Sequence, residues 1–361
     1  MKKDVRQRHE KSTRMKAMPW TGKIVNPAQL GGIETAVLDN GPGRGVRVAW
    51  VNTGTPLRYK VVLDRALDIA GAFYGAHSLA WLSHGGITAP KDNADRGLEW
   101  LRSFGGGLVT TCGLTHVGPP ESDEHGKRGI HGRISNLPAM LESVVQPDPA
   151  AGQYEMSITG VVQQTCLFGP NLELRRTISS RLGEAGIRIR DTILNRGNTP
   201  VPHMLLYHCN LGWPLVDKGA EFFWKGRCRS RGRPMDDELF ASGHDYHRCP
   251  GVLESHRGVR EACGFIDVTP DKEGMCTAGV RNRKLGLALS LRFRKRQLPW
   301  LTNWQHWGAG EFVTGLEPGT HPPIGQAAAR SQRSLLHIGP GKARKYELTI
   351  DVSRVSPRTP S

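Results

Sequence analysis

The chain has 361 residues, a formal net charge of +16 and a hydrophobic content of 38%. This length and composition are enough for a substantial buried core, and one large all-β domain falls within this size range. No stretch approaches the roughly 18 to 20 apolar residues of a membrane-spanning helix, and the first twenty residues have no apolar run behind their charged beginning. The sequence predicts neither a signal peptide nor a membrane anchor, so we expect a cytoplasmic protein with no membrane partner.

The basic excess raises nucleic acid as a partner, because clustered cations are the electrostatic footprint of phosphate binding. Residues 1–18 carry seven Lys or Arg against Asp4 and Glu10, and we expect residues 1–20 to be disordered. In KGRCRSRGR (225–233) the arginines alternate, so on a strand they would share one face, either solvated or anion-binding. No helix-turn-helix, RNP-like motif or zinc finger accompanies these runs, so we do not expect a nucleic-acid partner.

Strands are predicted along most of the chain, where short β-branched and alternating segments are separated by Gly and Pro. In chain order, the segments are 46–51, 59–64, 154–162, 172–179, 186–194, 285–293 and 345–350. The fourth and fifth segments read as a hairpin turning at LGEAG, with Leu172, Leu174 and Ile178 on one face of the first strand and Ile187, Ile189 and Ile193 on one face of the second.

Helical periodicity is nearly absent. KDNADRGLEWLRSF (91–104) is the best helix candidate, with Asp92 able to cap its start and three glycines after it. Many strands without intervening helices predict an all-β fold, a large antiparallel sandwich or barrel. We expect a single β-sandwich domain over residues 21–355, followed by a short tail at 356–361.

Seven cysteines are an odd number, widely spaced and without a C-x-x-C pair, which favours reduced thiols that pack in the core. H-D-Y-H (244–247) is the nearest approach to a metal motif, and its spacing does not predict a site. There is no G-x-S-x-G, Walker loop or H-E-x-x-H. We therefore expect no metal and no cofactor.

Polar residues that could contact a ligand occur first in two places. Arg65 and Asp68 precede an apolar strand, where the arginine either donates to ligand oxygens or pairs with Asp68. His131 and Arg133 flank Gly132, which would let the His131 ring and the backbone approach a ligand, although a lone loop histidine is often structural.

Two further clusters lie near strand ends. His208 and Asn210 share a strand face with Leu206, an arrangement that suits a polar ligand or a core histidine bonded to a backbone carbonyl. In NWQHWGAGEFVTGLEPGTHPP (303–323), the Pro-Gly pair after Glu317 predicts a turn that would hold this carboxylate at a rim. Glu311 lies six residues earlier, too far along one strand to form an acid pair, so we interpret it as structural.

The same stretch holds aromatic residues that could contact a sugar. Trp304 and Trp307 could form a stacking platform or pack in the core, because carbohydrate C–H faces stack on aromatic rings. The sequence pattern does not indicate a role for His306.

These clusters, in this order, resemble aldose 1-epimerases with the galactose mutarotase-like β-supersandwich. HGRISNLP (131–138) resembles the segment with that family's first substrate-binding histidine, HCNLG (208–212) the strand with the catalytic histidine, and TGLEP (314–318) the segment with the catalytic glutamate. Over roughly residues 24 to 352 the chain is most similar to a little-characterised, domain-of-unknown-function branch of the family. One departure is that His208 stands two residues before Asn210, where the family histidine usually stands four before.

The resemblance implies a carbohydrate-active isomerase that interconverts sugar anomers. Glu317 would be the base and His208 the acid, His131 and Arg65 would hold hydroxyl groups, and Arg133, Asn210 and Trp304 would line the substrate site. The partner would be a small carbohydrate, and the basic excess makes an anionic sugar a reasonable ligand. Two alternatives stay open: an epimerase or isomerase acting at another carbon of a sugar or sugar acid, and a noncatalytic carbohydrate-binding protein.

Overall fold

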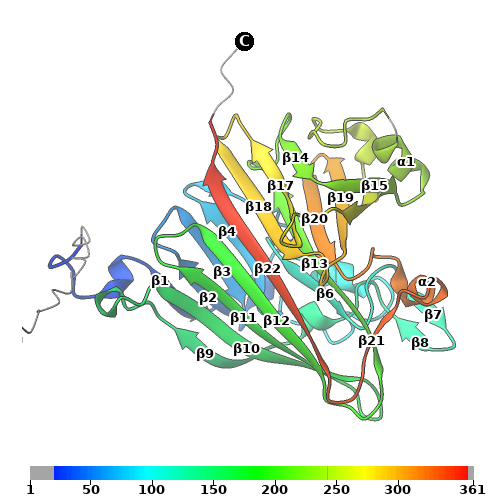
Figure 1. Ribbon diagram of the computed structural model, residues 1–361, viewed down its shortest axis with the longest axis horizontal. Helices are drawn as coiled ribbons and strands as arrows, with labels where there is room; N and C mark the ends of the chain where they lie inside the picture. Colours follow the sequence, from blue (N-terminus) through cyan, green and yellow to red (C-terminus); the bar gives the residue numbers. More distant parts are fainter. Residues whose placement is uncertain (1–19, 242, 357–361) are drawn as a thin grey trace, which may run out of the picture.

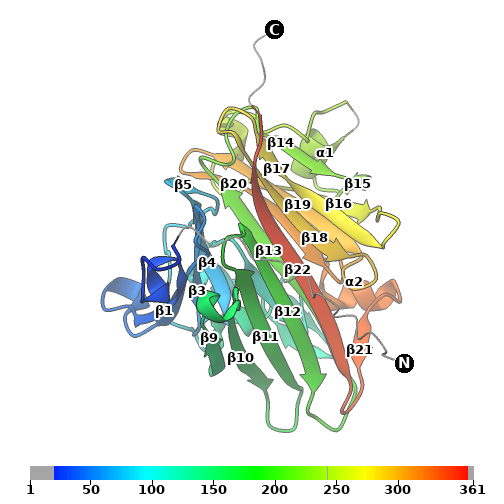
Figure 2. The same ribbon diagram turned by 60° about the vertical axis from the view of Figure 1, so that its left-hand side comes forward.

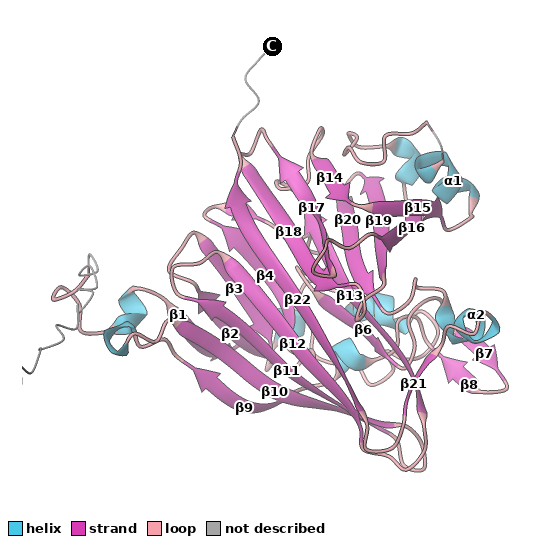
Figure 3. Ribbon diagram, viewed as in Figure 1, coloured by secondary structure: helices cyan, strands magenta, loops and turns pink. Residues whose placement is uncertain are grey.

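The computed structural model describes residues 20–241 and 243–356, so the predicted basic segment lies almost wholly outside it, as do the last five residues of the predicted tail. Strands dominate these described residues, as Figure 3 shows. The two α-helices are α1 (Pro234–Phe240) and α2 (Gly325–Ser331). Short 3-10 helices cover Pro27–Gln29, Gly41–Gly43, Glu99–Ser103, Ile134–Asn136, Pro149–Ala151 and Glu254–His256.

The largest sheet has eight antiparallel strands and crosses the molecule diagonally in Figure 1. Its order is β14 (Glu221–Trp224), β17 (Met275–Asn282), β18 (Leu287–Arg294), β22 (Ala343–Arg354), β12 (Gly186–Asn195), β11 (Asn171–Arg181), β10 (Glu155–Thr165) and β9 (Met140–Val145). The predicted hairpin is confirmed as β11 and β12, which pair from Leu172 with Asn195 to Ser179 with Arg188.

A second sheet carries the candidate site. Its order is β15 (Gly226–Ser230), β16 (Ala262–Val268), β19 (Trp300–Gly308), β20 (Glu311–Gly319), β13 (Val201–Gly212) and β21 (Leu336–Ile338), with β6 (Thr110–Leu114) also paired to β13. The long strand β13 lies between β20 and β6, and Figure 2 shows β13, β20 and β19 as neighbours. Residues far apart in the chain therefore meet on one sheet face.

The remaining strands form a five-stranded sheet and a small hairpin. The sheet comprises β1 (Gly32–Val37), β2 (Arg47–Asn52), β3 (Leu57–Val62), β4 (Asp68–Tyr74) and β5 (His77–Ser78), and the hairpin comprises β7 (Glu121–Asp123) and β8 (Gly126–Arg128). A bridge between Ile69 and Val109 brings the five-stranded sheet against the segment that enters β6. The predicted all-β antiparallel fold is thus confirmed.

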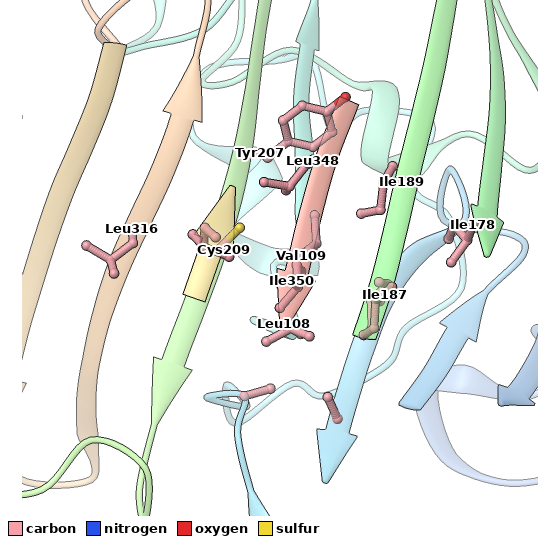
Figure 4. Close-up of a cluster of buried hydrophobic side chains, with 14 of the residues drawn as sticks. Leu108, Val109, Ile178, Ile187, Ile189, Tyr207, Cys209, Leu316, Leu348 and Ile350 are labelled. Atoms are coloured by element: carbon pink, nitrogen blue, oxygen red, sulfur yellow. The ribbon is translucent and has the colours of Figure 1, made fainter. Parts of the chain in front are cut away.

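The main core fills the space between the sheets. In Figure 4, isoleucines of β11 and β12 and residues of β22 approach Tyr207 and Cys209 of β13 and Leu316 of β20. The predicted faces of the hairpin are buried as expected. All seven cysteines are free thiols, and five of them are buried, which agrees with a packing role.

A network of buried charged residues is centred on Arg176. Arg176 is fully buried on β11 and donates to Asp191 at 2.6 Å and to Asp68 at 3.2 Å. The hydroxyl of Tyr207 completes the network by donating to Asp191 at 2.7 Å. The ion pair of Asp68 is therefore with Arg176 and not with Arg65, and a buried charge of this kind needs such partners to be tolerated.

The predicted helix at 91–104 is wrong. This segment forms turns followed by the 3-10 helix Glu99–Ser103. Gly97 adopts φ +48°, a left-handed conformation through which a right-handed helix cannot continue. No helix among the described residues is long and apolar enough to cross a membrane.

Candidate functional site

His208 and Glu317 lie side by side on the sheet that carries β13 and β20. The ladder pairs Cys209 with Leu316, which places His208 beside Glu317 with both side chains on the same sheet face. The His208 Nε2 and Glu317 Oε1 atoms are 3.4 Å apart, and the two side chains are 8% and 2% exposed. His208, which stands two residues nearer to Asn210 than the family histidine usually does, thus lies in contact with Glu317.

The position of Glu317 differs from the prediction. Strand β20 runs on through Pro318 to Gly319, so the carboxylate is buried within a strand and does not sit at a turn on a rim. Thr302 of β19 pairs with Glu317 on its other side. Glu317 is therefore flanked by His208 on one neighbouring strand and Thr302 on the other.

His131 reaches the same place from a loop. Its φ is +57°, an uncommon value for a residue with a side chain, and Gly132 follows with φ +69°. The backbone is held to β6, because the N–H of Gly113 donates to the His131 carbonyl at 2.9 Å. The His131 and His208 rings are 5.9 Å apart and perpendicular.

Aromatic side chains surround the two histidines. The His208 ring lies 5.3 Å from Trp304 and 5.2 Å from Phe104, and the His131 ring lies 5.0 Å from Trp100. Trp81 packs edge-on against Trp304 at 6.3 Å. Of these aromatic residues only Trp304 was predicted, because the others come from loops whose course the strand pattern does not specify.

Of the two roles considered for Trp307, stacking on a sugar or packing in the core, the structure shows core packing. Trp307 is fully buried and stacks on Phe222 at 5.9 Å, because residues three apart on a strand face opposite sides. His306 has a structural role, since its ring nitrogens lie 2.7 Å from the Glu311 carbonyl and 2.8 Å from the Gly258 carbonyl.

Unpartnered polar atoms concentrate in the group of side chains around His208 and Glu317, and the name recess is used below for this group. Among the described residues, ten buried side-chain polar atoms have no hydrogen-bond partner, and six of the ten belong to His131, His208, Asn210, Thr302, Trp304 and Glu317. The contact between His208 and Glu317 is close but not aligned as a hydrogen bond, so Glu317 Oε1 is one of the six. Native proteins rarely leave buried polar atoms unpaired, so these atoms form a surface that a hydroxyl-rich ligand would satisfy.

Burial sets the charge states in the recess. It lowers the pKa of His208 to about 4, and raises the pKa of Glu317 well above its ordinary 4.5, where the charge of Glu261 adds to the effect and that of Arg231 opposes it. Burial also lowers the pKa of His131. These shifts favour a neutral His208 beside a protonated carboxyl group on Glu317.

This arrangement predicts that Glu317→Gln stabilises the protein at high pH. Because burial raises the pKa of Glu317 in the folded state, its contribution to stability is complete below pH 4.5 and is lost as the pH rises towards the folded-state pKa. The variant lacks this loss, so we expect its melting temperature to exceed that of the parent by about 2 °C or more at pH 8 and to match it near pH 4.5. Differential scanning calorimetry measures both, and an equal difference at the two pH values would contradict the assignment.

Glu311→Gln is the matched control for this experiment. Glu311 lies on the same strand with its side chain 45% exposed, so we expect the melting temperature of this variant to stay close to that of the parent.

The structure does not bring the predicted arginines into the recess. The Arg65 guanidinium donates to Ser135 O, to Thr88 Oγ1 at 3.0 Å and to Ser103 O at 2.9 Å, which ties three segments together. Arg133 donates to Thr165 O at 3.0 Å. Substrate binding by either arginine stays a prediction, and the hydrogen bonds described here go to groups of the protein itself.

Asn210 faces the recess from β13. It pairs with Gly315 in the ladder, donates to Gly107 O at 3.0 Å and keeps its Oδ1 buried without a partner.

Within the described chain, no group of three or more His, Cys, Asp or Glu side chains could hold a metal ion. The H-D-Y-H segment (244–247) is therefore not part of such a group.

The sequence matches a family described as a domain of unknown function, DUF4432, over residues 43–352. The chain belongs to the DUF4432 family. A comparison with curated proteins found no match.

Solved structures show how this DUF4432 protein is related in fold. A candidate aldose 1-epimerase from Klebsiella pneumoniae is 22% identical, with 92% of this chain and 87% of that chain covered and a TM-score of 0.82. A galactose mutarotase-like protein from Clostridium acetobutylicum is 9% identical, with coverage of 90% and 98% and a TM-score of 0.62. A candidate mutarotase from Salmonella typhimurium is 11% identical, with coverage of 90% and 94% and a TM-score of 0.59. At these identities the comparisons show the fold, which is galactose mutarotase-like.

Proposed function

We propose that this DUF4432 protein is a carbohydrate isomerase of the aldose 1-epimerase type. The observation that carries the proposal is the buried pair of His208 and Glu317, 3.4 Å apart, in a recess that gathers six unpartnered polar atoms. Trp304 and the other aromatic rings provide faces for sugar C–H groups, and the polar atoms provide hydrogen bonds for hydroxyl groups.

Anomer exchange needs an acid and a base that act together. Glu317 takes the proton of the anomeric hydroxyl while His208 gives a proton to the ring oxygen, so that the bond between C1 and the ring oxygen breaks and an open aldehyde forms. Rotation about C1–C2 and closure on the other face, with the two protons returned, give the second anomer. The protein is unchanged at the end and no other reactant is consumed.

The charge states of His208 and Glu317 fit this scheme because the pair holds one shared proton. Neutral His208 with protonated Glu317 and imidazolium with carboxylate contain the same number of protons. Sugar hydroxyl groups that donate to Glu317 stabilise its carboxylate and leave the shared proton on His208. His131 and Asn210, each with an unpartnered buried atom, then hold neighbouring hydroxyl groups.

The pH dependence of kcat/KM tests the shared proton. We expect kcat/KM to fall as the pH drops through about 4, because His208 is then protonated as well as Glu317 and the pair holds two protons. We expect it to fall again above the raised pKa of Glu317, because the pair then holds no proton. The measurement is anomer exchange from pH 3.5 to 9, corrected for the spontaneous rate in each buffer. An acid limb centred near 6.5, the ordinary pKa of histidine, would contradict the buried neutral His208.

Deuterated buffer separates this function from isomerisation at another carbon. Anomer exchange breaks no C–H bond, so the sugar keeps its carbon-bound hydrogens while the anomers interconvert. Deuterium on a substrate carbon would favour epimerisation at that carbon, and binding without exchange would favour a noncatalytic carbohydrate-binding protein.

A further inference from the structure

A second cavity, apart from the recess, lies where β19 begins, β20 has just ended and β22 begins. Its volume is about 440 Å³, within the usual range of small-molecule sites. Its lining includes Arg296, Trp300, His321, Arg344, Lys345 and Tyr346. None of the residues that form the recess around His208 and Glu317 lines it.

The charge of this cavity is positive and uncompensated. Three cationic residues, Arg296, Arg344 and Lys345, line it, and no Asp or Glu does. None of the three forms an ion pair with a carboxylate of the described residues, whereas the neighbouring Lys295 is paired with Asp267. Cations kept together without carboxylates repel one another, and an anion bound between them would relieve this repulsion.

The cavity wall has fixed polar groups behind these cations. The Nε2 atom of His321 lies 2.8 Å from the Ser334 carbonyl, to which it donates, so its Nδ1 accepts from the Thr320 hydroxyl at 2.9 Å. Burial lowers the pKa of His321, and the charge of Arg344 adds to this effect, so the ring stays neutral. The Tyr346 hydroxyl is likewise held by His203 at 2.8 Å.

An aromatic ring supplies the apolar part of the cavity. Trp300 is partly exposed in its wall, and the guanidinium of Arg229 lies over the same ring at 5.4 Å from its centre. A ring held in this way offers a rigid flat surface to the body of a ligand, while the cations take its charged end.

We propose that this cavity binds an organic phosphate of about nucleotide or sugar-phosphate size. Arginine forks and a lysine ammonium recognise phosphate oxygens through charge-assisted hydrogen bonds, and Trp300 packs against the nonionic part of the ligand. This binding site lies outside the recess of the proposed function and does not depend on it.

Isothermal titration calorimetry with ADP and with inorganic pyrophosphate, at low and physiological salt, tests the proposal on the full chain. We expect saturable binding of ADP that the double variant Arg344→Gln/Lys345→Gln weakens at least tenfold. The matched control is Arg292→Gln/Arg294→Gln on β18, which removes the same charge from two exposed arginines outside the cavity. Its affinity for ADP should stay within about twofold of the parent. Arg296→Gln, at an exposed position, is a further test if the double variant does not fold.

Several results would overturn the site. One is the absence of ADP and pyrophosphate binding to the parent protein, and another is equal weakening by the two double variants, which would indicate only a diffuse basic surface. If the protein bound oligonucleotides more tightly the longer they were, the basic surface as a whole would be a nucleic-acid binding surface and the cavity would not be a separate site. Glu317→Gln separates the two sites, because ADP binding should survive it, whereas loss of ADP binding there would place the phosphate in the recess.

Discussion

Glu317→Gln is expected to reduce anomer exchange by about 10³-fold, within the range that a positioned acid or base contributes. The amide keeps the shape of the side chain but cannot take the anomeric proton, so sugar affinity should change little while kcat falls. Magnetisation-transfer NMR on neutral aldoses, uronates and sugar phosphates measures the exchange rate of each sugar. A fully active Gln variant would show that Glu317 is not the base.

The control for this loss is again Glu311→Gln, which alters a carboxylate of the same strand outside the recess. His306 lies beside Glu311, with the nearest nitrogen and carboxylate oxygen 3.8 Å apart, so this substitution touches the turn and not the site. We expect it to keep the parent exchange rate. If both glutamine variants lost activity equally, the effect would belong to strand β20 as a whole.

Much of the recess could be predicted from the sequence because its central residues lie on strands. His208 and Glu317 are on regular strands, where alternation decides which face a side chain occupies. The register that sets them opposite each other depends on pairing over more than a hundred residues, which the pattern of a single strand does not contain. The burial of Glu317 follows from that pairing, so its place within a strand could not be read from the Pro-Gly pair.

The residues that were missed come mainly from loops. Trp81 is held by its N–H donating to the Asn210 carbonyl at 3.0 Å, a contact between segments far apart in the chain. Trp100 and Phe104 belong to the segment predicted as a helix, and their stacked rings, 4.4 Å apart, reach the histidines because that segment turns instead. The secondary-structure propensity of a segment does not predict such long-range contacts, because they depend on tertiary packing.

Arg65 was predicted from the sequence as a ligand-binding residue, but in the structure its donors bond to the protein. Its position before an apolar strand and its five donors suit a ligand, and the same donors suit the carbonyl groups of surrounding loops. In the structure the Arg65 guanidinium donates hydrogen bonds to the carbonyl groups of Thr88, Ser103 and Ser135, and so links the three segments that contain them. The Arg65 guanidinium makes four hydrogen bonds to acceptors of the protein, and only the folded arrangement shows where these acceptors are.

Gly315→Ala is expected to lower kcat by about 10²-fold although Gly315 has no functional group, because a misplacement of about 1 Å can cost that much. A Cβ added at Gly315 would lie 2.2 Å from Glu317 Oε1 and 3.1 Å from its carboxyl carbon, so the carboxylate would have to move. Gly315 itself lies between Asn210 on β13 and Trp304 on β19, and it leaves the space that the Glu317 side chain occupies.

The fold should tolerate this change, because the backbone at Gly315 is ordinary strand and alanine loses less conformational entropy there than glycine. The matched control is Gly71→Ala in strand β4, where the nearest atom to the new Cβ is 3.8 Å away on Phe73. Exchange rates and melting temperatures of both variants separate the two effects. Because Gly315→Ala acts by moving the carboxylate, it should depress kcat at an unchanged melting temperature and shift the alkaline limb of the pH profile, whereas parent-like kcat would show that the present position of Glu317 is not required.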